Sequence, residues 1–169
     1  MQRNSRKSSF EIKNVPKRNN ETKEELVDMI VTLSNVVGSQ IDKGSISDVY
    51  RIRSKKEATQ NSSIIVETTS TFVKTDLLKA GKLFNTKHKS KLSAKHLGFR
   101  SQEETPIFIT EQLTAKGSRL HFLARDLVKS RLYRFCWAAY GVVYVRKDET
   151  SPIIKIHSEA QIHHLMQSI

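Results

Sequence analysis

The sequence predicts an α+β protein: a ferredoxin-like β-α-β-β-α-β domain, then a small α-β-β-β-α domain. Two observations predict it. Short runs rich in β-branched and aromatic residues alternate with segments of helical apolar spacing, and capping or turn residues bound most of them. A chain of 169 residues with 37% hydrophobic content suffices for one ordinary domain or two small ones. We expect a basic, disordered lead-in at 1–8, a first domain at 9–113 and a second at 114–169.

Local signals place the elements of the first domain. A strand starting at Phe10 ends at Pro16, since proline cannot donate to a sheet ladder. The capping box of Thr22 and Glu25 starts a helix, which Gly38 ends. The remaining predicted elements are strands at 46–52, 64–69 and 107–110 and a helix at 72–84.

The segment 85–106 is rich in Lys and His and has no apolar periodicity beyond a possible helical turn before Gly98. A structureless loop of this length argues either against the neighbouring assignments or for a functional role. We expect it to be a mobile basic flap over a binding surface.

The second domain begins at Thr114, the predicted N-cap of an amphipathic helix. Strands at 135–140, 142–146 and 153–157 form a meander, and Ser158 caps a last helix. In the first of these strands Trp137 is expected to pack in the core. On the next strand Tyr144 and Arg146 share a face, which suits stacking on unpaired bases.

Positive charge dominates two regions of the chain. The net charge is +12, with twelve Lys or Arg against three Asp or Glu from Arg51 to Arg100, and eight against one from Thr114 to Lys147. Such a surplus usually faces nucleic-acid phosphates. The alternative is an ordinary protein with lysine-rich loops.

Catalytic and metal-binding patterns are not found in the sequence. Six histidines and one cysteine show no telling spacing, and there is no glycine-rich phosphate loop. No stretch of about 18 apolar residues exists to span a membrane. We expect a non-enzymatic, intracellular protein without metal or cofactor, in either the nucleus or the cytoplasm.

A β-α-β-β-α-β domain invites comparison with RNA recognition motifs, which stack bases on aromatic side chains of the sheet. Here the strand at 62–69 has no aromatic residue, and Phe10 and Tyr50 are the only candidates on its neighbours. The RRM-like domain is therefore expected to bind phosphates electrostatically. Its candidate residues are Arg51, Arg53, Lys55, Lys56, Lys79, Lys82, Lys87, Lys89, Lys91 and Lys95.

Two stretches, 107–127 and 135–165, resemble the few-polyhedra (FP) protein family of baculoviruses, whose C-terminal domain recurs in insect retroelement-derived proteins. VYVRKDE (143–149) is the most specific match, and ITEQLT (109–114) is another. Weaker matches lie upstream of residue 107. With them, the domain layout of the chain is similar to that of the first open-reading-frame protein of LINE retrotransposons.

The resemblance implies two small domains that form a basic cleft for single-stranded RNA. It implies RNA contacts at Lys79, Lys82, Arg119, Arg125, Arg134 and Arg146. We expect this chain to lack the coiled-coil stalk of family members, and it has Tyr140 and Ala115 where the family often has Asn and Pro.

The sequence therefore predicts a single-stranded nucleic-acid-binding protein of retroelement or viral origin, for RNA more than DNA. The alternative is a protein-interaction or assembly module that uses Phe122 and the aromatic strand, with possible self-association.

Overall fold

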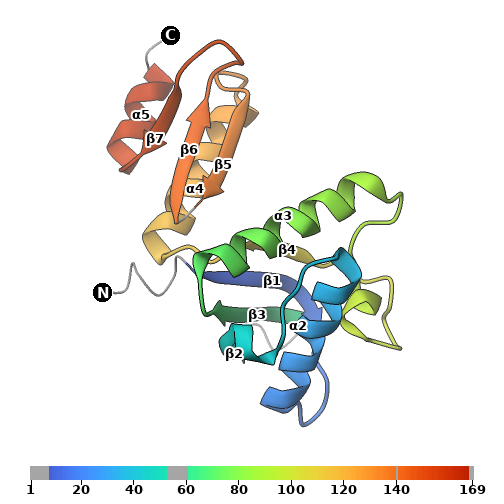
Figure 1. The fold of residues 1–169 in the computed structure, drawn as a ribbon. Helices are drawn as coiled ribbons and strands as arrows, with labels where there is room; N and C mark the ends of the chain where they lie inside the picture. The colour runs from blue at the N-terminus through green and yellow to red at the C-terminus, as the bar shows by residue number, and fades with distance from the viewer. Residues whose placement is uncertain (1–7, 53–60, 140, 168–169) are drawn as a thin grey trace. The chain divides into compact units, whose positions relative to one another are not determined.

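The computed structural model describes residues 8–52, 61–139 and 141–167. The chain divides into two compact units, Met1–Gln112 and Leu113–Ile169, each with its own sheet and hydrophobic core (Figure 1). The α+β class and the order of strands and helices predicted from the sequence are confirmed.

The N-terminal unit is a four-stranded antiparallel sheet in the order β2-β3-β1-β4. Its elements are β1 (Ser9–Pro16), α2 (Lys23–Val37), η1 (Lys43–Ser45), β2 (Ile46–Arg51), β3 (Asn61–Thr68), α3 (Thr71–Lys87), η2 (Ala94–Leu97) and β4 (Phe108–Glu111). This is the ferredoxin-like topology, in which the first and third strands are central.

Both helices of this unit cover the same side of the sheet. Phe10 and Ile12 of β1 join Ile30 of α2 and Leu77 of α3 in one buried cluster. The predicted capping box is present, since the Thr22 side chain accepts from the backbone N–H of Glu25 and the Glu25 side chain accepts from that of Thr22. Phe10 is therefore a core residue and not a base-stacking platform.

The segment after α3 is held to the body of the unit, so the expectation of a mobile flap is wrong. Leu92, Ala94, Leu97 and Phe99 are all buried in the core of the unit. The backbone N–H groups of Ala94, Lys95 and Ile107 donate to carbonyls of Thr105, Glu103 and Leu92. The four apolar side chains have no helical or strand period, which is why the sequence pattern does not show their burial.

The C-terminal unit is a three-stranded antiparallel meander in the order β5-β6-β7. Its elements are α4 (Ala115–Lys129), β5 (Phe135–Ala139), β6 (Val142–Arg146), β7 (Ile153–Ile156) and α5 (Glu159–Gln167). Thr114 caps α4, because its hydroxyl oxygen accepts from the N–H of Gly117 at 2.9 Å.

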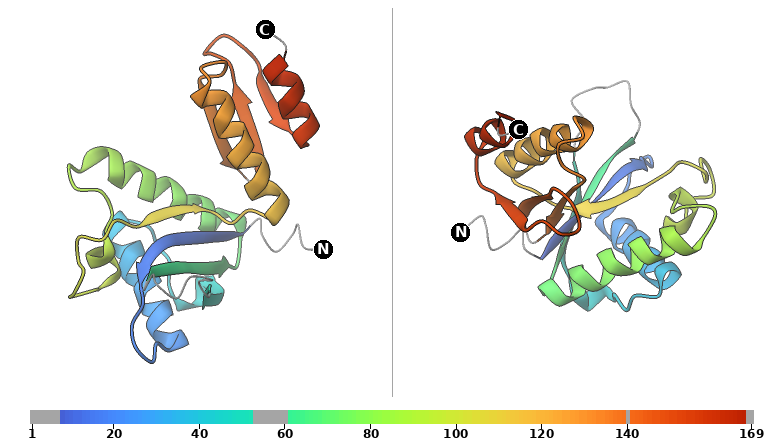
Figure 2. Two further views of the ribbon diagram at one scale, coloured as in Figure 1. Left: turned by 180° about the vertical axis from the view of Figure 1, so that it is seen from behind. Right: turned by 90° about the horizontal axis from the view of Figure 1, so that it is seen from above.

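Helices α4 and α5 pack on one side of this meander. Leu120, Ala124 and Leu127 of α4 and Ile162 of α5 form a core with Val143, Val145 and Ile156. In Figure 1 α4 lies behind β5 and β6, and in the left view of Figure 2 it lies in front of them. Within this unit, no described helix covers the other side of the sheet.

Gly141 begins the return from β5 to β6 with φ 77°, a left-handed conformation that suits glycine. Tyr140, where the family often has Asn, and residues 1–7 of the lead-in predicted at 1–8 fall outside the described residues. Over the described ranges, no helix is long and apolar enough to cross a membrane.

Candidate nucleic-acid interface

The uncovered side of the C-terminal sheet carries aromatic and basic side chains. Trp137 lies opposite Tyr144, and Tyr144 lies opposite Lys155. Residues directly opposite in an antiparallel pair point to the same side of the sheet. Phe135 and Arg146 form a second pair on this side. We call Phe135, Trp137, Tyr144, Arg146 and Lys155 the aromatic face.

Trp137 stacks on Tyr144 and is not a core residue, contrary to the sequence-based expectation. The two ring centroids are 5.6 Å apart with an interplanar angle of 19°. Alternation along β5 and β6 sends Val143 and Val145 into the core and leaves both rings on the outside. Neither the Tyr144 hydroxyl nor the Trp137 indole N–H has a hydrogen-bond partner among the described residues.

Lys155 is a candidate that sequence reasoning missed. It is exposed beside Tyr144, and its ammonium makes no ion pair within the described part of the chain. The signal was present: Ile156 faces the core and Ile154 packs against it, so the intervening lysine must face outward.

Arg146 lies on the aromatic face, but its guanidinium holds the following turn. Its Nε donates to the carbonyl oxygen of Ser151 at 2.8 Å, and an Nη donates to the carbonyl oxygen of Glu149. The partners are backbone carbonyls and not the carboxylates of Asp148 or Glu149. This use of the guanidinium competes with phosphate binding.

Asp148 organises the same turn from within. Its carboxylate accepts from the hydroxyls and backbone N–H groups of Thr150 and Ser151, at 2.8 to 2.9 Å. These hydrogen bonds, that from the Thr150 hydroxyl first, lower the pKa of Asp148 to about 2. The turn therefore presents the carbonyl groups that Arg146 binds.

The other predicted arginines of this unit make exposed contacts. Arg134 lies 3.7 Å from the Glu149 carboxylate, with its guanidinium 5.5 Å from the Phe135 ring centroid. Arg119 joins α4 to α5 through Glu159 at 3.2 Å. Arg125 lies over the ring of Phe122 at 6.0 Å. Exposed contacts of this kind open at little cost.

Helix α4 packs on the side of the sheet opposite to the aromatic face. It therefore does not bring Arg119 or Arg125 together with Tyr144. Arg134, which directly precedes β5, is the predicted arginine that lies beside the aromatic face with an exposed guanidinium, its side chain 67% exposed.

In the N-terminal unit Arg51 is a buried structural residue. Its side chain is 8% exposed, and its guanidinium binds both carboxylate oxygens of Glu21, at 2.7 and 2.8 Å. It also donates to the carbonyl oxygens of Val15 and Pro16 and to Ser62. Because these partners occupy the guanidinium, it is not available to a phosphate. Arg53, Lys55 and Lys56 lie outside the described residues.

The six remaining predicted lysines of this unit are all exposed. They are Lys79, Lys82 and Lys87 on α3 and Lys89, Lys91 and Lys95 after it. Lys95 has a long contact with Glu104 at 3.4 Å. Lys74, on the same helix, is instead buried and paired with Glu111 of β4.

On the outer side of the N-terminal sheet the two central strands carry no aromatic residue, and the exposed rings of Tyr50 and Phe108 lie on the two edge strands. At the centre of this side Glu11 lies opposite Ile65 and Thr110, and Tyr50 lies opposite Ile65. A carboxylate in the middle of the sheet repels phosphate. The sequence-based argument against stacking on this sheet agrees with this arrangement.

Metal-ligating side chains are dispersed over the described residues. These residues contain no group of three or more His, Cys, Asp or Glu that could hold a metal ion. Burial raises the pKa of the Cys136 thiol, which disfavours the thiolate form that nucleophilic chemistry needs.

A comparison with known families matches residues 114–166 to the family described as Baculovirus FP protein domain 2. The match runs from the N-cap of α4 into α5 and includes VYVRKDE. That motif has a structural meaning, because it supplies two core valines, an aromatic-face tyrosine and the turn aspartate. No curated protein matches the chain. The resemblance to the FP family predicted from the sequence is thus confirmed as a family match over residues 114–166.

Proposed function

We propose that this protein binds single-stranded nucleic acid, RNA in preference to DNA, through the aromatic face of its C-terminal unit. The observation that carries the proposal is the Trp137–Tyr144 stack on a sheet face that no described helix of the unit covers. Unpaired bases stack on such rings whatever their identity, because every base has a π-face. The preference for RNA rests on the resemblance to RNA-binding retroelement proteins.

Charge beside the rings supports phosphate binding. Lys155 lies directly across from Tyr144, and Arg134 lies over the Phe135 ring. Both carry exposed cationic groups, so a strand whose bases reach the rings would place phosphates near these cations. The overall net charge of +12 adds long-range attraction.

The chain has a single tryptophan, and it lies in the proposed interface. Titrating the full chain with a 12-nucleotide oligouridylate while recording tryptophan fluorescence therefore reports on this face directly. We expect saturable quenching, and an affinity that falls steeply between two salt concentrations. The same titration with oligothymidylate measures the preference for RNA.

Tyr144→Ala tests the stack, and Phe122→Ala is its matched control. Phe122 is an exposed aromatic residue of the same unit, 53% exposed, on α4. We expect Tyr144→Ala to weaken binding about tenfold, in line with loss of one base–aromatic stack, and Phe122→Ala to leave binding unchanged. Equal effects of the two variants, or salt-independent binding, would overturn the proposal and favour a polypeptide partner.

A further inference from the structure

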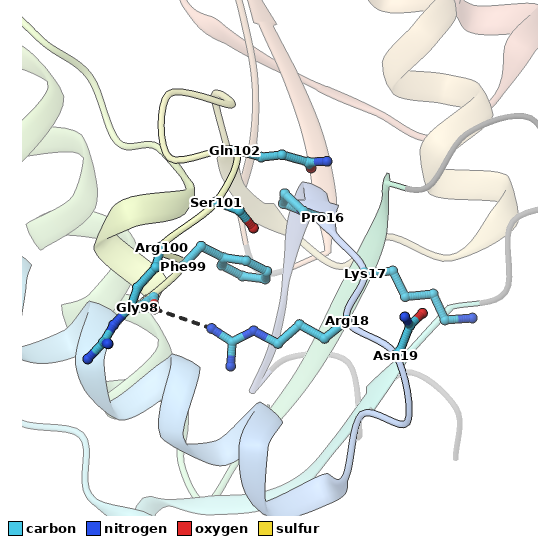
Figure 3. A pocket seen from close by; sticks show the side chains of 9 residues that line it. All are labelled: Pro16, Lys17, Arg18, Asn19, Gly98, Phe99, Arg100, Ser101 and Gln102. Atoms are coloured by element: carbon cyan, nitrogen blue, oxygen red, sulfur yellow. Dashed lines mark hydrogen bonds between the residues drawn. The ribbon is translucent and has the colours of Figure 1, made fainter.

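A hollow of about 630 Å³ opens on the N-terminal unit between two loops far apart in the sequence (Figure 3). One loop follows β1 and the other follows η2. The lining residues are Pro16, Lys17, Arg18, Asn19, Gly98, Phe99, Arg100, Ser101 and Gln102. Three of them are cationic and none is acidic, so the hollow is electropositive.

Arg18 and Phe99 form a preorganised wall of the hollow. The guanidinium carbon of Arg18 lies 4.4 Å from the centroid of the Phe99 ring, and one Nη donates to the carbonyl oxygen of Gly98 at 3.2 Å. Phe99 is 5% exposed and belongs to the core, so it holds the guanidinium in place. The other N–H groups of Arg18 have no partner among the described residues.

Four polar or charged side chains that line the hollow with this wall are Lys17, Asn19, Arg100 and Ser101. Figure 3 shows the Ser101 hydroxyl near the Phe99 ring, the Asn19 carboxamide beside Lys17 at one side, and Lys17 and Arg100 extending on opposite sides. Within the described ranges, none of these four side chains has a hydrogen bond or ion pair. A planar ring stacked on the Arg18 guanidinium therefore has hydrogen-bond donors and acceptors in the same hollow. Lys17 and Arg100 supply a cation on either side to attract an anionic group.

We propose that this hollow binds one nucleotide, with the base against the Arg18 guanidinium and the phosphate held by Lys17 or Arg100. A nucleotide unites a planar ring that has a hydrogen-bonding edge with a phosphate, which matches the stacked guanidinium, the polar groups and the cations. The volume lies within the range of small-molecule sites. This inference goes beyond the function proposed above, because the hollow lies in the N-terminal unit and no residue of the aromatic face lines it.

The test is a titration of the ¹⁵N-labelled full chain with uridine and adenosine monophosphate, followed by amide chemical shifts. We expect saturable shifts at Gly98, Phe99 and Ser101 with a nucleotide, and weaker binding of inorganic phosphate or of the nucleoside alone. Arg18→Gln should weaken nucleotide binding about tenfold, as for loss of a charged hydrogen bond. Arg100→Gln should weaken it about threefold, since its cation is exposed.

Lys129→Gln is the control, because Lys129 is an exposed cation on α4 of the other unit. Arg100→Gln keeps the test valid if Arg18→Gln disturbs the loop, since Arg100 makes no described side-chain contact. Absence of saturable shifts, equal binding of phosphate and nucleotide, or equal effects of Lys129→Gln and both Arg variants would each overturn the proposal.

An oligouridylate added to the Tyr144→Ala variant separates two sources of the nucleotide. Shifts at Gly98 and Ser101 with the oligonucleotide identify a nucleotide within a strand, and shifts with the monophosphate alone identify a free nucleotide. In the wild-type chain, absence of tryptophan quenching by the oligouridylate with these shifts present would count against the aromatic face and not against the hollow.

Discussion

Trp137 of β5 and Tyr144 of β6 lie directly opposite each other, with ring centroids 5.6 Å apart on the side of the sheet away from α4 and α5. The pairing depends on the hairpin register, because a slip of one residue would move either ring to the core side. The tight return at Gly141, with its left-handed φ, sets that register.

Lys155 should contribute to the salt dependence of single-strand binding. Lys155→Gln removes an exposed cation beside Tyr144. We expect the slope of log K against log salt to flatten by about 0.7, the amount for one bound phosphate. Arg125→Gln, on α4, should leave the slope unchanged. The measurement is the tryptophan titration at four salt concentrations, and the reverse ranking of the two variants would contradict the assignment of the interface.

Arg51 should matter for folding and not for binding. Arg51→Ala leaves the Glu21 carboxylate, whose side chain is 6% exposed, without its partner. We expect the free energy of unfolding to fall by about 3 kcal/mol, measured by urea denaturation. The double variant Arg51→Met with Glu21→Leu should be destabilised less than Arg51→Ala alone, because no buried charge remains. A stable Arg51→Ala protein with weakened oligonucleotide binding would show that Arg51 binds phosphate instead.

The segment 92–107 should behave as part of the folded unit. Amide hydrogens of Ala94, Lys95 and Ile107 donate to backbone carbonyls, so they should exchange more slowly than that of the exposed Lys89. Leu97→Ala should cost about 2 to 5 kcal/mol, because Leu97 is 2% exposed in the core. Rapid exchange throughout the segment, with little effect of Leu97→Ala, would restore the expectation of a flap.

The exposed lysines of that region remain candidates for phosphate binding. Replacing Lys87, Lys89, Lys91 and Lys95 together by Gln tests them as a set. If they bind phosphates, the affinity for all single-stranded sequences should fall alike, and the salt slope should flatten by about 0.7 for each phosphate that is no longer bound. The core is untouched, so the melting temperature should stay within a few degrees of wild type. Unchanged affinity and slope would identify them as solvated surface.

The Asp148 turn should lose its contribution to stability in acid. The folded-state pKa of about 2 lies below the ordinary value of 3.8, because Thr150 and Ser151 donate to the charged form. The stabilisation is therefore complete above about pH 4 and is lost as the pH falls through about 2. Wild type should exceed Asp148→Ala in melting temperature at pH 6, and the difference should shrink toward pH 2.

Glu149→Gln is the control for this pH series. The Glu149 carboxylate is 75% exposed and accepts no hydrogen bond from the turn in the described structure, so its removal should leave the acid profile unchanged.

A carbon-detected NMR titration of the Asp148 carboxyl with a midpoint near 4 would contradict the prediction.

Local chemistry was enough to predict most of the elements. The capping box at Thr22 and Glu25, the cap at Thr114 and the glycine at position 38 act within a few residues of chain, and each is found where the pattern places it. The family likeness of the C-terminal unit was readable in the same way, because VYVRKDE combines strand alternation with a turn aspartate.

The site was harder to predict, because alternation gives two faces without saying which one is buried. Trp137 was expected in the core, yet α4 and α5 cover the side that carries Val143 and Val145. The alternation in β7 was sufficient to predict that Lys155 faces outward. Its position beside Tyr144 follows only once β6 is known to be the partner strand.

By itself the sequence determined the α+β class, the order of elements, the positive charge and the likeness of residues 114–166 to the FP domain family, because these depend on local pattern and composition. Tertiary structure decided which cations are available. It buried Arg51 against Glu21, turned Arg146 onto a loop and brought Arg18 onto Phe99. These outcomes depend on contacts between residues distant in the chain, whose pairing is set by packing and not by any repeat in the sequence.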